Sequence, residues 1–509
     1  MHTHSQALGS LTPSRILGIR RGVEKESLRT LADGSLALTP HPQGLGSALT
    51  HPHITTDFSE SQLELITGVH PSVQSCLDEL TQVQQVTMRE LGDEVMWVSS
   101  MPCCLPQDDA IPLGQYGSSN LGRSKTLYRS GLCHRYGRRM QTISGIHYNW
   151  SLPDVSSEQY FGLIRNFRRH AFLLLYLFGA SPAVCSTFVA GRQHQLQALN
   201  AGTMYLPYAT SLRMGRLGYQ SDAQASLAVS YNSLQGYGAS LQDALTRPYP
   251  AYEAMGVRGP NGEYRQLATT LLQIENEFYG TIRPKRVIHQ GERPLHALRE
   301  RGVEYVEVRL MDLDPFEPMG INSQTMRFLD VFLLHCLLTD SPPDTPQEIV
   351  ALAHNQHNTA ERGREPGLKL ERGDATVTLG DWGLELVTQL LPFAQQFDAA
   401  VGGTEYVAAV ESAAHALRHP DTLPSARVLR EVTENFDGSF VAFVKAQSVK
   451  TRQAMLDAEL SPAVREQYAQ EARKSVEDQR KIEAGDSMPF DIYLQEYLSP
   501  RHLNPAKPL

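Results

Sequence analysis

Several segments of the chain alternate apolar and polar residues with the period of two that is typical of β-strands. The clearest is 303–310 (VEYVEVRL). Successive side chains of a strand point to opposite faces, so the apolar residues at 306, 308 and 310 share one face. The other face carries Tyr305, Glu307 and Arg309. A carboxylate and a guanidinium two residues apart, backed by an apolar face, predict a strand that lines a polar cleft.

Three further segments, 22–28, 140–151 and 272–279, are predicted as strands of the same kind. Each places polar residues on one face: Glu24 and Glu26; Gln141, His147 and Asn149; Gln273, Glu275, Glu277 and Tyr279. Asp57 and Glu64 flank another short segment. Any antiparallel sheet with one solvated side has such faces, and this alternative stays open for each acid alone. If the strands are neighbours, their carboxylates repel unless a hard cation neutralises them, most often Mg²⁺ bridging nucleotide phosphates.

Helix signals frame two other segments. Ser156 and Gln159 have the spacing of a capping box, which predicts a helix that ends at Gly179. A charged run that opens at Pro462 and closes at Gly485 predicts a long, exposed helix. The strands are separated by unequal connections rather than by regular βαβ units. We therefore expect an α+β protein with a mainly antiparallel sheet.

The proline-rich segment 340–346 (DSPPDTP) is the best candidate for a linker. It divides the chain into an expected catalytic part, residues 1–340, and a mainly helical part, residues 341–509, packed on it. Within the second part, 354–374 is polar, and we expect it to form an excursion on the surface.

Composition excludes several classes of protein. A chain of 509 residues with 41% hydrophobic residues can bury a sizeable core. The net charge of −9 argues against nucleic-acid binding, which needs a basic stripe. The most apolar stretch, 171–180, is shorter than the roughly 20 residues that a bilayer requires. No membrane association is therefore expected.

The six cysteines include no C-x-x-C pair, so we expect reduced thiols rather than disulfides or a structural zinc site. The first residues show no secretory signal, and a cytoplasmic location is expected. No G-x-x-x-x-G-K-[ST] loop is present. Instead, Arg283, Lys285 and Arg286 follow an acidic segment directly, and they are candidates for binding phosphate. A solvated basic cluster is the alternative.

Eight blocks in one order together resemble the proteobacterial-type glutamate–cysteine ligases. They are RGVEKESLR (21–29), GSALTHPHITTDFSESQLELIT (46–67), QYGSSNLGRSKTLYRSGL (115–132), YGRRMQTISGIHYN (136–149), LFGASPAVC (177–185), MYLPYATSLRMGRLGY (204–219), LLQIENEFYGTIRPKR (271–286) and GVEYVEVRLMDLDPF (302–316). The resemblance extends over roughly residues 15–500 and weakens after about residue 340. The segment after Leu152 is shorter than is usual in the family.

The resemblance implies a glutamine-synthetase-like core in which an antiparallel sheet curls into a cup. It also implies the first step of glutathione biosynthesis: ATP-dependent joining of the γ-carboxylate of glutamate to the amine of cysteine, through a γ-glutamyl phosphate. Mg²⁺ is the expected metal, with Mn²⁺ as a substitute. Glutathione is expected as a feedback inhibitor, and the protein is expected to be a monomer.

Residue by residue, the family's pattern assigns four sets of positions. The Mg²⁺ ligands would be Glu24, Glu26, Asp57, Glu64, His147 and Glu307. Glu307, Arg213 and Arg309 would be catalytic, and the two arginines would hold glutamate or neutralise the transferring phosphoryl group. The residues around cysteine would be Phe58, Tyr128, Leu132, Gln141, Tyr219 and Tyr279. Arg283, Lys285 and Arg286 would bind ATP.

Two other functions remain open at this point. A related carboxylate–amine ligase would keep the acids and arginines but would accept a different amine. A non-catalytic ligand-binding protein would keep the fold alone. The sequence singles out no general base.

Overall fold

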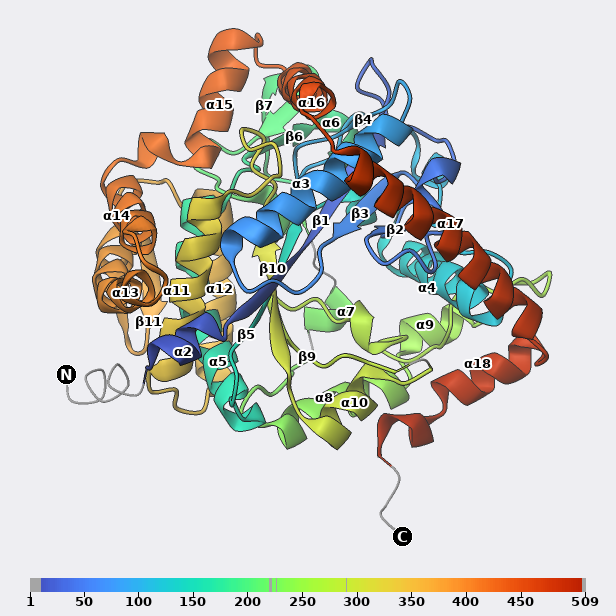
Figure 1. The fold of residues 1–509 in the computed structure, drawn as a ribbon. Coiled ribbons are helices and arrows are strands. Elements are labelled where there is room, and N and C mark those ends of the chain that lie inside the picture. Colours follow the sequence, from blue (N-terminus) through green and yellow to red (C-terminus); the bar gives the residue numbers. More distant parts are fainter. Residues whose placement is uncertain (1–10, 219–221, 226, 290, 506–509) are drawn as a thin grey trace.

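A seven-stranded antiparallel sheet forms the centre of the computed structural model (Figure 1), which describes residues 11–218, 222–225, 227–289 and 291–505. The strand order is β2-β3-β1-β5-β10-β9, and β4 pairs with the end of β1. The strands are β1 Arg20–Thr30, β2 Ile54–Thr56, β3 Gln62–Ile66, β4 Val95–Met96, β5 Ile146–Ser151, β9 Ile282–Lys285 and β10 Tyr305–Met311. The predicted α+β architecture with an antiparallel sheet is confirmed.

One face of this sheet is apolar and is covered by helices. Helices α3 (Val73–Glu90) and α5 (Ser157–Phe178) pack directly on it, and α11 (Ser323–Leu338) packs on α5. Val306 and Val308 of β10 are fully buried beneath these helices. Because side chains alternate along a strand, the acidic residues of β1, β3 and β10 lie on the opposite face.

Smaller elements surround the sheet. A three-stranded sheet has the order β6-β8-β7, with β6 Ala183–Cys185, β7 Gln197–Asn200 and β8 Thr203–Tyr205. The helices of the first 340 residues are, besides those above, α2 Pro13–Leu17, α4 Asn120–Tyr136, α6 Ser186–Val189, α7 Asp222–Ala225, α8 Leu234–Thr246, α9 Pro250–Met255 and α10 Pro294–Arg301. Short 3₁₀ turns are η1 Gln43–Leu45, η2 Asp108–Ala110, η3 Arg139–Thr142, η4 Leu212–Met214 and η5 Glu275–Glu277.

The remaining chain is mainly helical. Its elements are α12 Pro346–Arg362, β11 Lys369–Arg372, β12 Ala375–Thr378, α13 Leu379–Val401, α14 Glu405–Arg418, η6 Pro420–Thr422, α15 Pro424–Asn435, α16 Phe440–Asp457, α17 Pro462–Gly485, α18 Phe490–Leu498 and η7 Pro500–Leu503. Trp382 of α13 stacks on Phe172 of α5, with ring centroids 4.4 Å apart, so the helical part shares a core with the part before it. The division at residue 340 remains a prediction. None of the described helices combines the length and apolar character needed to cross a membrane.

Both predicted helices are confirmed. Helix α5 begins after Ser156, whose Oγ accepts the N–H of Gln159 at 3.3 Å, while the Gln159 side chain accepts the N–H of Ser156 at 2.9 Å. The helix ends at Gly179, as its sequence predicts. Helix α17 spans Pro462–Gly485 with Ser461 as its N-cap, and in Figure 1 it runs along the outside of the molecule.

Three expectations about segments are wrong. Segment 272–279 is not a strand: it contains one 3₁₀ turn, because Glu275 and Glu277 turn inward to buried arginines instead of lining a sheet. Segment 140–151 becomes a strand only from Ile146, after the 3₁₀ turn η3. Segment 354–374 is not a surface excursion, because α12 extends through its first half and packs on α5, and the hairpin β11–β12 follows.

Candidate active site

The sheet register brings the predicted acids together. Glu26 on β1 lies opposite Glu64 on β3, and Glu24 on β1 lies opposite His147 on β5. On the far side of β5, Glu307 on β10 lies opposite Asn149. Four neighbouring strands therefore present carboxylates and an imidazole to one face, and Asp57 joins them from the turn after β2.

Two overlapping groups of donor atoms result. Glu24, Glu64 and His147 each offer one atom within 4.8 Å of the others, and so do Glu26, Asp57 and Glu64. Burial, together with the nearby charges of Glu24 and Asp57, raises the pKa of Glu64 well above its ordinary value. Burial also raises the pKa of Glu26. Excess negative charge in a site removed from solvent is the condition that a bound cation relieves.

His147 connects the two carboxylates of β1. Its Nδ1 lies 2.9 Å from Oε2 of Glu24, and its Nε2 lies 3.5 Å from Oε1 of Glu26. Burial by itself would raise the pKa of Glu24, but the hydrogen bond with His147 and the nearby charges of His147 and Lys285 together lower it. Asn149 donates to the other oxygen of Glu24 at 2.9 Å, so this carboxylate is fixed in orientation.

Cationic side chains border the acids at β10 and β9. Arg309 NH1 and Lys285 Nζ each lie 3.2 Å from a carboxylate oxygen of Glu307, and Arg283 NH1 lies 4.0 Å away. Burial opposes ionisation of Glu307, but Lys285 and Arg309 overcome burial and hold its pKa well below the ordinary range. Glu307 is therefore an ionised carboxylate between the acidic and basic halves of the face.

Arg286 does not join this cluster. It follows β9, and its Nε lies 3.4 Å from Glu304 while its NH1 donates to the carbonyl of Arg301 at 2.6 Å. Alternation along the strand explains the difference, because Arg283 and Lys285 point to the face of Glu307 and Arg286 points away. Of the three residues proposed for phosphate, the structure brings two together.

Arg213 reaches the same face from η4, and it is almost fully buried. Its NH2 donates to the carbonyl of Arg309 at 2.8 Å, and its NH1 lies 3.9 Å from Oδ1 of Asp312. The guanidinium also packs against Gly145, where a Cβ atom would lie 2.1 Å from NH2. Gly145 is thus the residue that lets Arg213 approach β5.

Asp312 is a residue that sequence reasoning missed. Its Oδ2 accepts the N–H of Ala180 at 2.9 Å and the hydroxyl of Ser181 at 2.6 Å, and its Oδ1 accepts the hydroxyl of Ser211 at 3.0 Å. Asp312 thereby anchors the loop that carries Arg213. A single aspartate one residue after β10 has no pattern that would have revealed it.

The predicted cysteine-pocket residues are placed as follows. Tyr279 lines a cavity of about 360 Å³ together with Arg213 and Arg309, and its hydroxyl accepts the side-chain amide of Gln141 at 2.9 Å. Phe58 and Leu132 are buried. Tyr128 has its phenol pKa raised by burial and by the charges of Glu277 and Tyr279, which places it in the same neighbourhood. Tyr219 lies outside the described residues.

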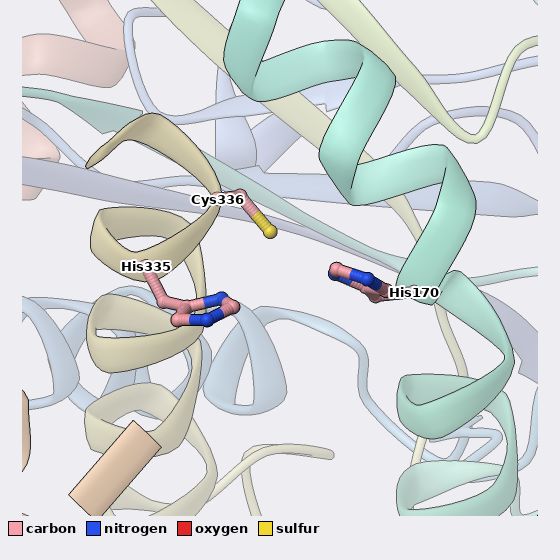
Figure 2. A group of neighbouring side chains, drawn as sticks. All are labelled: His170, His335 and Cys336. Atoms are coloured by element: carbon pink, nitrogen blue, oxygen red, sulfur yellow. The ribbon is translucent and has the colours of Figure 1, made fainter. Parts of the chain in front are cut away.

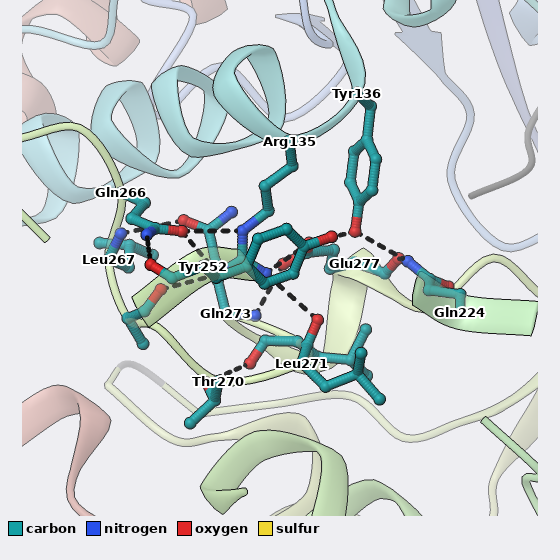
Figure 3. A network of polar contacts seen from close by, with 12 residues as sticks. Arg135, Tyr136, Gln224, Tyr252, Gln266, Leu267, Thr270, Leu271, Gln273 and Glu277 are labelled. Atoms are coloured by element: carbon teal, nitrogen blue, oxygen red, sulfur yellow. Dashed lines mark hydrogen bonds and ion pairs between the residues drawn. The ribbon is translucent and has the colours of Figure 1, made fainter. Parts of the chain in front are cut away.

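A polar network surrounds Glu277 (Figure 3), two residues before Tyr279. Oε1 of Glu277 lies 2.9 Å from Arg135 NH1 and accepts the hydroxyl of Tyr136 at 2.6 Å. Gln224 donates to the carbonyl of Glu277 at 2.8 Å. The side chain of Gln224 also accepts the N–H of Tyr279 at 3.1 Å. Glu277 is therefore a structural acid beneath the pocket, and no sequence pattern indicates that its partner is Arg135.

Hard oxygen donors lie on one half of the sheet face, and fixed cations lie on the other half. This arrangement is typical of a class of enzymes that activate an anionic substrate by phosphoryl transfer. Residues 10–359 match the sequence model of a family described as glutamate-cysteine ligase. Glutamate–cysteine ligases of Alcanivorax borkumensis and Saccharophagus degradans are 46% and 45% identical to this chain, and the alignments cover 95% and 97% of it and 96% and 97% of those proteins.

Comparison with solved structures indicates the same family. A crystal structure of glutamate–cysteine ligase from Francisella tularensis in complex with AMP has a TM-score of 0.90 at 38% identity, covering 94% of this chain and 97% of that one. A bifunctional glutathione synthetase from Pasteurella multocida has a TM-score of 0.69 at 25% identity, covering 89% of this chain and 54% of that one. The chain belongs to the glutamate–cysteine ligase family, as the sequence blocks predict. The reaction of this family is the ATP-dependent formation of γ-glutamylcysteine, and the chain is a ligase of this class.

Proposed function

We propose that the open face of the central sheet is where this chain joins glutamate to cysteine, with ATP as co-substrate. One observation carries the proposal: two overlapping groups of oxygen and imidazole donors lie directly beside Arg309, Lys285 and Arg283, and Glu307 lies between the two halves. ATP with a bound metal ion fits this division of charge, because the acidic half offers ligands for the metal and the basic half offers ligands for the phosphates.

The proposed Mg²⁺ ligands are those that the family resemblance assigns: Glu24, Glu26, Asp57, Glu64, His147 and Glu307. The donors fit a hard divalent cation, since five of the six are carboxylates, and Glu26 and Glu64 have pKa values raised by burial. When bound, Mg²⁺ screens the phosphoryl oxygens of ATP as charge redistributes between them. Mn²⁺ has the same preference for oxygen and is proposed as a substitute.

Activation of glutamate is the first step that these residues would serve. A carboxylate is a poor electrophile, so an oxygen of the γ-carboxylate attacks the γ-phosphorus of ATP, and ADP leaves with the electron pair of the broken P–O bond. Arg309 and Arg213 are placed to hold the glutamate carboxylate and the transferring phosphoryl group, because a planar guanidinium binds two oxygens at once. Lys285 and Arg283 are the proposed contacts of the remaining phosphates, and Arg286 belongs to this set only if it leaves Glu304.

Amide formation is the second step. The amine of cysteine attacks the carbonyl carbon of γ-glutamyl phosphate, phosphate leaves, and the surplus proton of the amine passes to solvent. The cavity beside Tyr279 is the proposed place for this amine substrate, with Tyr128, Gln141, Phe58, Leu132 and Tyr219 as its other residues. Aromatic rings suit a thiol side chain, since sulfur packs well at ring edges.

Other properties are proposed on the basis of the family. Glutathione, which contains the product's γ-glutamylcysteine unit, is the proposed feedback inhibitor of this site. A monomer in the cytoplasm is the proposed state of the protein. The complex of the Francisella tularensis ligase with AMP supports the proposal that this chain binds a nucleotide.

The decisive experiment is identification of the product by mass spectrometry. Purified protein is incubated with ATP, Mg²⁺, glutamate and cysteine, and γ-glutamylcysteine, ADP and phosphate are expected in equal amounts. Parallel reactions with 2-aminobutyrate, serine and glycine test the choice of amine, and cysteine is expected to have the highest kcat/KM. A different preferred amine would make the chain a related ligase, and no ADP release with any amine would make it a non-catalytic binding protein.

A further inference from the structure

Three metal-binding side chains meet on the other side of the sheet from the acids. His170 projects from α5, and His335 and Cys336 project from α11 where it crosses α5 (Figure 2). One ligand atom from each of the three lies within 4.8 Å of the others. Figure 2 shows both rings and the thiol directed into the space between the two helices.

This cluster is buried but has access to solvent. His335 and Cys336 are 1% and 0% exposed. A cavity of about 290 Å³ lies beside the histidines and is lined by Asn166, Arg169, Thr339 and Gln389 among others. A metal ion can enter along this cavity, and a water molecule has room to complete its coordination.

Aromatic side chains pack against both histidines, and burial keeps His170 and Cys336 in their uncharged forms. Trp382 packs edge-on against His170 with ring centroids 6.4 Å apart, and Phe393 packs edge-on against His335 at 5.4 Å. Burial lowers the pKa of His170 to about 3, so at neutral pH this imidazole is uncharged and has a lone pair to offer. Burial raises the pKa of Cys336 well above its ordinary value, so the thiol must release its proton to solvent when it binds a metal.

We propose that His170, His335 and Cys336 form a binding site for one soft transition-metal ion, Zn²⁺ or Cu⁺. Two imidazoles and one thiolate are a donor set that these ions prefer and that Mg²⁺ avoids. Zn²⁺ takes the water as its fourth ligand, whereas with Cu⁺ the thiolate cancels the charge of the ion inside the core. Ligands of one ion lie roughly 3.5 Å apart, and the three donor atoms already lie within 4.8 Å of one another, so small rotations about the χ angles suffice to bring them to that spacing.

The sequence could not show this site, because its donors come from two helices and include no C-x-x-C pair. The expectation of no structural zinc site therefore rested on a local pattern alone. The cluster also lies apart from the proposed active site, since α5 packs on the apolar face of the sheet and α11 packs on α5.

Cobalt absorption tests the proposal on the full-length protein. Co²⁺ bound by a thiolate gives a sulfur-to-metal charge-transfer band in the near ultraviolet, and the acidic cluster, which contains no sulfur, gives none. Titration of the reduced wild-type protein with Co²⁺ is expected to produce this band, saturating at one ion per chain. Zn²⁺ or Cu⁺ added in equal amount is expected to remove it, and the ion that removes it more completely is the favoured occupant.

Amino-acid substitutions identify the thiol that produces the sulfur-to-cobalt band. Cys336→Ala is expected to abolish it, and His170→Phe, which fits beside Trp382, is expected to weaken Co²⁺ binding at least tenfold. Cys76→Ala is the matched control, because Cys76 is equally buried but lies on α3, and it is expected to retain the full band. Absence of the band in the wild type would overturn the proposal without any variant. Loss of the band in Cys104→Ala or Cys185→Ala, with Cys336→Ala unaffected, would assign the metal to another thiol and would also overturn it.

Discussion

The guanidinium of Arg135 lies 2.9 Å from the carboxylate of Glu277, and neither side chain is exposed to solvent. The pair joins the end of α4 to the turn that precedes Tyr279. Gln224 then ties this turn to the backbone of Tyr279, and Tyr136 packs edge-on against the Tyr279 ring at 5.9 Å. A charged pair in the interior thus determines where one wall of the proposed cysteine pocket lies.

Glu277→Gln is expected to raise the KM for cysteine by about tenfold and to leave the KM for ATP within about twofold. The substitution removes the charge partner of Arg135 and loosens the turn, and losing one member of a buried pair costs about 3 kcal/mol of stability. Steady-state kinetics with each substrate varied in turn measure the effect. Glu275→Gln is the control, because Glu275 is also a buried acid of the same turn but pairs with Arg293. Equal loss of cysteine affinity in both variants would show general damage to the turn.

Glu307→Gln is expected to lower kcat by about 10² to 10³ while the protein stays folded. The change removes the carboxylate that lies between the donor groups and the cations, and it leaves the apolar face of β10 untouched. Turnover and circular dichroism are measured together. Glu304→Gln, a half-exposed acid three residues earlier, is expected to keep normal activity. A folded Glu307→Gln enzyme with near-normal turnover would remove Glu307 from the site.

Arg309→Lys is expected to lower kcat/KM by roughly 10²-fold although the charge is kept. Arg309 NH1 lies 3.2 Å from Glu307 and 3.4 Å from Nδ1 of His147, so its planar group is held where two oxygens of a substrate can be bound together. Lysine supplies a single flexible charge. Arg301→Lys, in a rim pair with Glu292, serves as the comparison and is expected to be neutral. Activity of Arg309→Lys within about twofold of the wild type would assign Arg309 to a simple ion pair.

Gly145→Ala is expected to lower kcat/KM for glutamate by about 10²-fold. The new Cβ would lie 2.1 Å from Arg213 NH2, so the guanidinium must move, and a misplacement of about 1 Å is enough for such a loss. Gly380→Ala is the matched control, because a Cβ at this position meets no atom within 4 Å. If Gly145→Ala is fully active, Arg213 does not act from its present position.

His51 is expected to make the protein less stable in mild acid. Its Nδ1 accepts the N–H groups of His53 and Ile54, both at 3.0 Å, and burial together with the charge of His53 lowers its pKa to about 4. The unfolded chain, with the ordinary histidine pKa of about 6.5, then binds more protons than the folded one, so stability falls as the pH drops from about 6.5 towards 4.

The loss attributable to His51 between pH 7 and pH 5 is expected to be roughly 2 kcal/mol. His51→Asn keeps an acceptor for the two N–H groups but cannot titrate. Its thermal midpoint, measured across this pH range, is therefore expected to fall less steeply than that of the wild type. Parallel curves for the two proteins would contradict the assignment.

The elements that could be predicted are those whose signal is local. The alternation in 303–310 reflects a strand with a buried face, so β10 and the placement of Glu307 beside Arg309 follow directly from the sequence. The capping pair Ser156–Gln159 likewise encodes the start of α5. The resemblance to a family then indicated the remaining proposed ligands, and the sheet register brings these residues together.

What the sequence could not show depends on partners distant along the chain. Glu275 and Glu277 alternate like residues of a cleft-lining strand, but Arg293 and Arg135 draw them into the interior. Nothing in a period of two distinguishes an acid that faces a cleft from one that faces a buried arginine. Asp312 was missed for the same reason, because its role consists of contacts with residues about a hundred or more positions earlier.

Glu64 belongs to both donor groups of the open face. Two ions bound there would share a ligand, so their binding free energies would be linked: whatever one ion does to the affinity of the other, the other does in return. The loss of metal affinity on substituting both Glu24 and Asp57, which belong to different groups, would then differ from the sum of the two single losses. Once Glu64 is substituted, a second change at Glu24 or Asp57 would add little further loss. With ions in both groups, the shared carboxylate would make the metal content of the site a cooperative property rather than a sum of independent positions.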